Sequence, residues 1–193
     1  MSLRVSFELS KADLQHFRII MREARDAAAD KPKSEVLSAA RQLLDSVGDI
    51  ELPEFVGDRI ARIQVMIDMV EDREWKLPDE DTARVVNALA YFGEPDDLIP
   101  DHVPGLGFLD DAIMVELVVR ELRHEIDAYT DFCRFRSVEE KRRGGRGAED
   151  EMTREQWLSA RRKELHSRMR ERRLRERTRR GARSGGRSPF SLF

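Results

Sequence analysis

Apolar side chains recur at helical spacing along most of the chain. From Leu52-Pro53 to residue 70 they follow a 4,3,4,3 rhythm over four turns, which is the clearest amphipathic stripe in the sequence. The same spacing predicts helices over residues 10–29 and 34–47, separated by Lys31-Pro32. The members of the clearest stripe are Val56, Ile60, Ile63, Ile67 and Val70. We expect this stripe to form the centre of the core.

Capping residues set the boundaries of these first helices. Ser10, with Asp13 three residues later, predicts the N-cap of the first helix. Ser34 predicts the N-cap of the second, which should end at Gly48. The N-terminal half is therefore expected to consist of three consecutive helices.

Two further helices are predicted after residue 78. Pro78 and three following acids favour a helix over 79–92, because carboxylates stabilise a helix N-terminus. After an irregular stretch, apolar spacing predicts one long helix from Gly107 or Phe108 to Arg136. We find no alternating strand pattern bounded by turns, so the predicted fold class is all-α. The predicted architecture is a bundle of about five helices with a proline-rich hairpin connection.

Charge divides the chain into an acidic body and a basic C-terminal part. Residues 1–138 hold 17 Lys and Arg against 29 Asp and Glu, whereas residues 139–193 hold 18 against 9. The net charge of −3 therefore conceals local values of −12 and +9. Such asymmetry favours an acidic partner for the basic part, or contact of that part with its own body.

Glycine and charge runs set the predicted domain plan. The plan is a helical bundle at 1–137, a flexible linker at 138–152, a basic charged helix at 153–180 and a disordered tail at 181–193. The charged helix has a thin apolar stripe of Trp157, Leu165 and Met169. It is interpreted either as a solvated charged helix or as a binding arm, since interleaved glutamates dilute its arginines. The candidate binding residues are Arg161, Arg162, Arg168, Arg172, Arg175 and Arg179.

Composition bears on the cellular compartment. A single cysteine, Cys133, cannot form an intramolecular disulfide, and the N-terminus lacks the apolar stretch of a signal peptide. The most apolar region, 98–119, is interrupted by four acids, two prolines and two glycines, which a membrane-spanning helix does not tolerate. We expect a cytoplasmic protein, either free or peripheral at the inner face of the membrane.

One dense motif lies between the fourth and fifth predicted helices. Residues 88–117 read ALAYFGEPDDLIPDHVPGLGFLDDAIMVEL. They contain every position of the pattern PxDLIPDxxPxxGxxDD. These positions are Pro95, Asp97, Leu98, Ile99, Pro100, Asp101, Pro104, Gly107, Asp110 and Asp111.

By this motif the chain resembles the YkvA-like family, domain of unknown function 1232. The resemblance covers about 82–120. It implies a compact helical hairpin with an ordered, proline-studded connection, in a family with many membrane-associated relatives and no established reaction. The resemblance therefore predicts a structural element but no catalytic activity.

The aspartates of the motif have two interpretations. Asp97, Asp101, Asp110 and Asp111 could ligate a hard cation, since such ions prefer clustered carboxylate oxygens in irregular loops. Alternatively they cap turns and helix starts, which is the commoner use of aspartate at such positions. We expect no cofactor.

Weaker patterns do not support an enzyme. Glu121 and His124 match one Glu-x-x-His unit of a di-iron bundle, but such a site needs a second copy and two further acids. His102 beside Asp101 has no nucleophile or phosphate-binding loop with it. A solvated helix face and a loop histidine are the expected readings.

Three functions remain open from the sequence. The first is a non-enzymatic interaction protein that presents a mobile basic arm to a protein partner. The second is a peripheral protein whose arginines bind anionic lipid while Leu98, Ile99, Val103, Leu106 and Phe108 touch the membrane. The third is a cation-binding protein or metal-dependent enzyme using the aspartates. Nucleic acid is a further partner for the basic arm, and the oligomeric state is not indicated.

Overall fold

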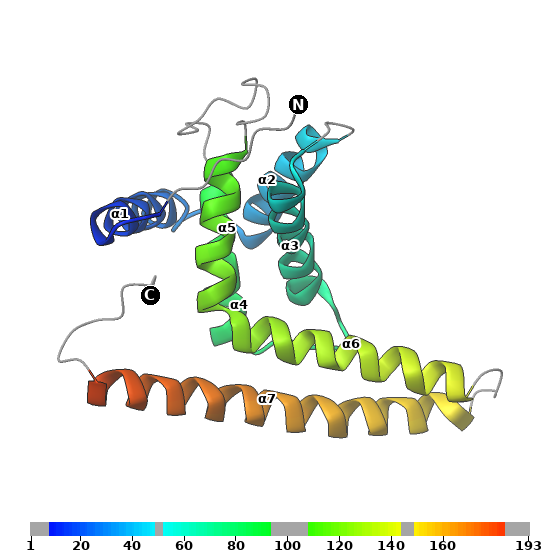
Figure 1. The fold of residues 1–193 in the computed structure, drawn as a ribbon. Coiled ribbons are helices and arrows are strands. Elements are labelled where there is room, and N and C mark those ends of the chain that lie inside the picture. The colour runs from blue at the N-terminus through cyan, green and yellow to red at the C-terminus, as the bar shows by residue number, and fades with distance from the viewer. Residues whose placement is uncertain (1–7, 49–51, 94–107, 144–148, 184–193) are drawn as a thin grey trace.

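The computed structural model describes residues 8–48, 52–93, 108–143 and 149–183, whose regular secondary structure is entirely helical, without strands. The all-α prediction is confirmed. The helices are α1 (Lys11–Ala27), α2 (Lys33–Val47), α3 (Glu54–Glu71), α4 (Asp79–Leu89), α5 (Leu109–Glu121), α6 (Arg123–Arg143) and α7 (Glu149–Arg183). A short 3₁₀ helix, η1 (Ala90–Gly93), continues α4. The first five helices form a bundle, and α6 and α7 lie side by side beneath it (Figure 1).

Helix α1 begins with the predicted cap. The Ser10 hydroxyl accepts a hydrogen bond from the Asp13 N–H at 3.2 Å, and the Asp13 carboxylate accepts one from the Ser10 N–H at 2.7 Å. This reciprocal pair satisfies two N–H groups that a helix start leaves free. Those hydrogen bonds lower the pKa of the Asp13 carboxyl below its usual value.

Helix α2 corrects the predicted N-cap at Ser34. The N-cap is Pro32, and its carbonyl accepts hydrogen bonds from the N–H groups of Glu35 and Val36 at 2.9 and 3.4 Å. Ser34 consequently lies inside the first turn of α2. Proline suits this start because its fixed φ, −64° here, lies close to helical values and its missing N–H is not needed there.

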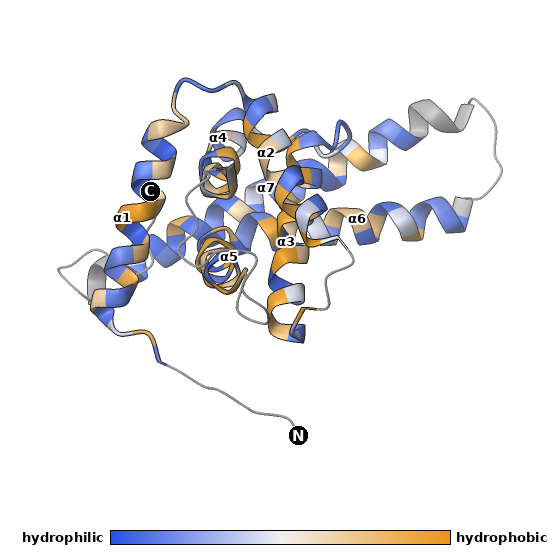
Figure 2. Cartoon of the chain, turned by 90° about the horizontal axis from the view of Figure 1, so that it is seen from above, coloured by the Kyte–Doolittle hydropathy of each residue, from blue (hydrophilic) through white to orange (hydrophobic). Residues whose placement is uncertain are grey.

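Helix α3 forms the centre of the core, as the stripe predicts. Val56, Ile60, Ile63 and Ile67 are buried and Val70 is partly buried. Helix α3 packs against α2, α4, α5 and α6, and hydrophobic positions gather on α3 and α5 (Figure 2). Burial of a Val or Ile side chain contributes about 1.5–3 kcal/mol, so this stripe is a main source of stability.

The prediction of one long fifth helix is wrong, because the structure has two helices, α5 and α6, that are separated at Leu122. Leu122 has φ −94° and ψ 13°, and it separates α5 from α6. Its side chain is fully buried, which fixes the bend. No proline or glycine occurs between residues 109 and 143, so the sequence contains no local signal for this break. Beyond the bend, α6 runs along α7.

The C-terminal part also differs from the predicted plan. Residues 138–143 continue α6 and residues 149–152 begin α7, so much of the predicted linker at 138–152 is helical. Helix α7 extends to Arg183, past the predicted end at 180 and into the predicted tail. The rest of that tail lies outside the described residues. The basic helix is not a separate arm here, since it packs against α6.

Candidate interaction surface on the C-terminal helix

Most of the motif lies outside the described residues, including Asp97, Asp101 and His102. Asp110 and Asp111 stand in the first turn of α5, as the helix-start interpretation expects, and both are buried. In the described part of the chain no three His, Cys, Asp or Glu side chains gather in a way that could hold a metal ion. The two loop aspartates of the predicted cation site lie outside these residues.

The surface expected to touch lipid is also largely outside the described segments. Of its members only Phe108 is described, and its side chain is 2% exposed. Phe108 is the N-cap of α5, with φ 64°, and it belongs to the hydrophobic core cluster. No helix within residues 8–48, 52–93, 108–143 or 149–183 has the length and hydropathy needed to cross a membrane.

The structure separates the predicted binding arginines into two groups. Arg162 is buried and Arg161 is partly buried, whereas Arg168, Arg172, Arg175 and Arg179 are exposed. Helix α7 therefore has an inner face, turned to the body, and an outer face. These two faces must be considered separately.

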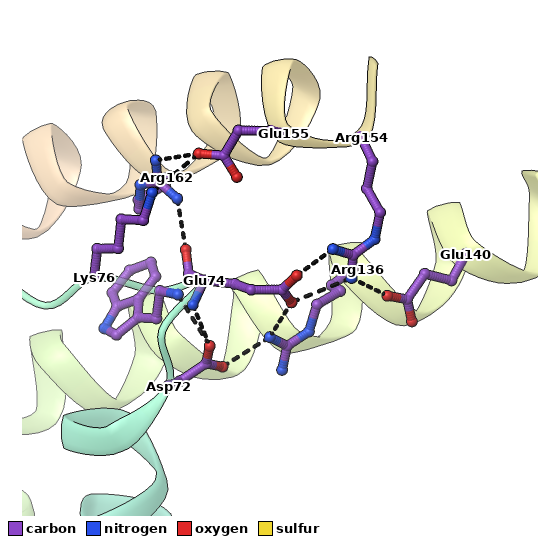
Figure 3. Close-up of polar contacts among 9 residues, drawn as sticks. Asp72, Glu74, Lys76, Arg136, Glu140, Arg154, Glu155 and Arg162 are labelled. Carbon is purple, nitrogen blue, oxygen red and sulfur yellow. Dashed lines mark hydrogen bonds and ion pairs between the residues drawn. The ribbon is translucent and has the colours of Figure 1, made fainter. Parts of the chain in front are cut away.

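A polar clamp fixes the N-terminal part of α7 (Figure 3). We use this name for Asp72, Glu74, Arg136, Arg154 and Arg162. The Glu74 carboxylate accepts hydrogen bonds from Arg154 of α7 and, at 2.9 Å, from Arg136 of α6. The Asp72 carboxylate also accepts from Arg136 at 2.8 Å, and the Glu74 carbonyl accepts from Arg162 at 2.6 Å. The clamp thus joins α6, α7 and the segment after α3.

Electrostatics within the clamp favour its charged form. The hydrogen bond from Arg154 holds the pKa of the Glu74 carboxyl below its usual value, and Arg136 adds to this effect. Glu140 of α6 also accepts a hydrogen bond from Arg154 at 2.6 Å. Lys76 and Arg162 both meet Glu155, each at 3.2 Å. Because several charges share partners, the clamp is more than an isolated surface ion pair.

Aromatic and apolar contacts hold the middle of α7. Trp75 is fully buried, and its ring meets that of His166 edge-on with centroids 4.3 Å apart. Tyr129 and Phe132 of α6 pack on the same indole. The buried apolar positions of α7 are Leu158, Leu165 and Met169. These side chains explain why the thin stripe of α7 is sufficient for docking.

A buried ion pair holds the C-terminal half of α7. Arg173 donates hydrogen bonds to Asp81 of α4 and, at 2.9 Å, to Glu125 of α6. The exposed fractions of the Asp81 and Glu125 side chains are 2% and 0%, so both carboxylates depend on nearby cations. Arg84 lies 3.4 Å from Glu125 and shares this role. The sequence indicated Asp81 only as an acid at a helix start and did not single out Arg173 or Glu125.

The Glu-x-x-His fragment also contacts α7. His124 Nε2 lies 2.7 Å from a carboxylate oxygen of Glu176, and Arg123 donates to the same oxygen at 2.6 Å. A contact with the C-terminal helix is therefore the role that the structure gives His124.

The outer face of α7 carries two kinds of cation. The exposed Arg168 and Arg175 pair with Glu164 and Glu171 at 3.2 and 3.4 Å. The partly buried Arg161 also pairs with Glu164, at 2.8 Å, and its guanidinium lies over the Phe135 ring of α6. Five other cations are exposed and form no ion pair within the described residues. We call them the outer cations: Lys163, Arg170 and Arg177 along one side of α7, and Arg172 and Arg179 along another. The inner arginines are neutralised by the body, and the outer cations are left to solvent.

Comparison with known proteins adds one assignment. Residues 83–117 match the family model described as "Protein of unknown function (DUF1232)". The matched segment runs from α4 into α5 and contains the motif on which the resemblance rests. Neither a curated protein nor a solved structure matches the chain significantly. The family match does not extend to α7, whose role rests on its own geometry.

Proposed function

We propose that the chain is a non-enzymatic interaction protein that binds an acidic protein partner through the outer cations of α7. One observation supports this proposal above the others. Acids of the body pair with Arg154 and Arg173 of α7, while the outer cations remain exposed and without ion pairs among the described residues. Unpaired cations concentrated on one helix create a local positive potential, which attracts and orients an acidic partner.

Docking of α7 also lowers the entropic cost of binding. A free charged helix would lose conformational freedom on meeting a partner. Helix α7 is already held at the clamp, at Trp75 and at Arg173, so its outer face is presented in a fixed arrangement. Helix α7 would thus bind its partner as a fixed, docked helix rather than as a mobile arm.

Replacing the five outer cations with glutamine should weaken partner binding at least about tenfold, since tenfold corresponds to only about 1.4 kcal/mol and five charges are removed. A matched control replaces Lys11, Arg22, Lys33, Arg62 and Arg134, which are equally exposed but scattered over four other helices. Both variants have the same net charge. The tagged full chain and both variants are used to recover binding proteins from soluble and membrane fractions, and affinities are measured with the purified partner.

The control variant should retain binding within about twofold. Equal loss in the two variants would show an effect of net charge alone and would contradict the proposal. Vesicles containing anionic lipid form a separate arm of the experiment. If only these vesicles bind, and binding depends on the outer cations, the peripheral-membrane function replaces the one proposed.

A further inference from the structure

An exposed stripe runs along the outer face of α7 at coiled-coil spacing. Its members are separated by four, three, four and three residues, and all are exposed. The stripe contains three of the outer cations and Leu174, which at 65% is the most exposed large hydrophobic residue in the described part of the chain. We call it the outer stripe: Lys163, Ser167, Arg170, Leu174 and Arg177.

From this spacing we infer that the acidic partner is an α-helix that lies along the outer stripe and carries carboxylates at heptad intervals. The inference rests on the proposed function and specifies its partner. Lys163, Arg170 and Arg177 are seven residues apart, so their Cα atoms are separated by about 10.5 Å at 1.5 Å per residue. A second helix aligned with α7 repeats at the same interval, and its acids can meet each cation in turn.

An extended strand fits this interval poorly. Side chains on one face of a strand recur every two residues, or about 6.6–6.8 Å. An interval of about 10.5 Å falls between one and two such repeats, so consecutive acids of a strand cannot face all three cations. Helical geometry is therefore the regular structure that matches the stripe.

Leu174 further favours a protein over a lipid or phosphate surface. It lies between Arg170 and Arg177, where it can contact an apolar side chain at the centre of a helix pair. Helices that bind membranes carry several large apolar residues on one face, whereas this stripe has one. A phosphate backbone offers an exposed leucine no apolar contact.

Two labelled peptides test the inference by fluorescence anisotropy with the full chain. One is an alanine-rich helix of about four heptads, with glutamate at one position of each heptad and a leucine placed to meet Leu174. The other has the same composition and net charge, with the glutamates at irregular intervals. We expect the heptad peptide to bind at least about tenfold more tightly, because only its acids coincide with the cations.

Two charge-matched variants identify the surface used. Arg170→Gln with Arg177→Gln should weaken heptad-peptide binding about tenfold or more. Arg62→Gln with Arg134→Gln removes the same charge from exposed positions on α3 and α6, away from the outer cations, and should change binding less than about twofold. Leu174→Ala should also weaken binding several-fold. Equal affinities of the two peptides, or equal losses in the two double variants, would overturn the inference.

The native partner separates this inference from the proposed function. If its binding is lost with all five outer cations but is unaffected by Arg170→Gln and Arg177→Gln, the proposed function holds and the helical partner is rejected. If the five-residue glutamine variant binds the native partner as tightly as the unaltered chain does, the proposed function is contradicted, whatever the affinities of the two peptides. Stronger binding of an anionic vesicle or an oligonucleotide than of the heptad peptide also overturns the inference.

Discussion

Replacing Arg173 with alanine should lower the free energy of unfolding by about 3–5 kcal/mol, the usual effect of removing one partner from a buried ion pair. The substitution leaves Asp81 and Glu125 buried with Arg84 as the only other cation paired with them in the described structure. The desolvation cost of the carboxylates then remains, while the attraction that offset it is lost. The expected effect is large because both carboxylates are almost completely shielded from water.

Tryptophan fluorescence during urea unfolding measures this effect directly. The chain has two tryptophans, and both contribute to the packing of α7: Trp75 contacts His166, and Trp157 contacts Phe135 of α6. Arg170→Ala is the matched control, since Arg170 is exposed on the same helix and should change stability by no more than about 0.5 kcal/mol. Adding Asp81→Asn to Arg173→Ala should recover part of the loss. Similar stability of the Arg173 and Arg170 variants would exclude the buried ion pair.

Acidification should weaken the protein through His166, with a loss on the order of 2–3 kcal/mol between pH 7 and about 4.5. Burial, in part against Trp75, is the main cause that lowers the pKa of His166 to about 4. The charge of Asp81 raises this pKa, whereas the charges of Arg162 and Arg170 lower it further. The unfolded chain has the ordinary value of about 6.5. Between these values the unfolded state binds more protons, so stability is complete above about pH 6.5 and declines toward pH 4.

The His166→Phe variant isolates this contribution from the titration of carboxylates. Phenylalanine keeps an aromatic ring beside Trp75 and cannot be protonated. Urea unfolding at pH 7 and 4.5 should therefore show a smaller acid-induced loss for the variant than for the unaltered chain, by about 2–3 kcal/mol. An NMR titration of the imidazole gives the pKa itself, and a midpoint near 6.5 would contradict the buried placement of His166.

The bundle could be predicted well because its signals are local. The α3 stripe has four consecutive heptad-like steps, and the Ser10 and Asp13 cap depends on residues three apart. Patterns of this kind need no knowledge of distant contacts. The break at Leu122 was not predictable, because it follows from packing of α5 on α3 and of α6 on α7 rather than from a helix-breaking residue.

The candidate surface was only half predictable. Arginines on α7 look alike in sequence, yet Arg162 and Arg173 face the body while Arg170 and Arg177 face solvent. Arg173 faces the body because it pairs with Asp81 and Glu125, which lie 92 and 48 residues away in the sequence. No local pattern reveals such distant partners. The pairs Glu164–Arg168 and Glu171–Arg175, by contrast, follow local i,i+4 spacing. Glu176 meets Arg123 and His124 of α6.

Hydrogen exchange in the isolated full chain tests most directly whether α7 is a fixed platform. Amides between Leu158 and Arg173 are the relevant probes, because this part of α7 is held by apolar contacts and the buried ion pair. We predict exchange at least about a hundredfold slower than in an unstructured peptide, without any partner present, since these amides open only when α7 leaves the body. Exchange at the unstructured rate would show that α7 is undocked in solution and would contradict the account.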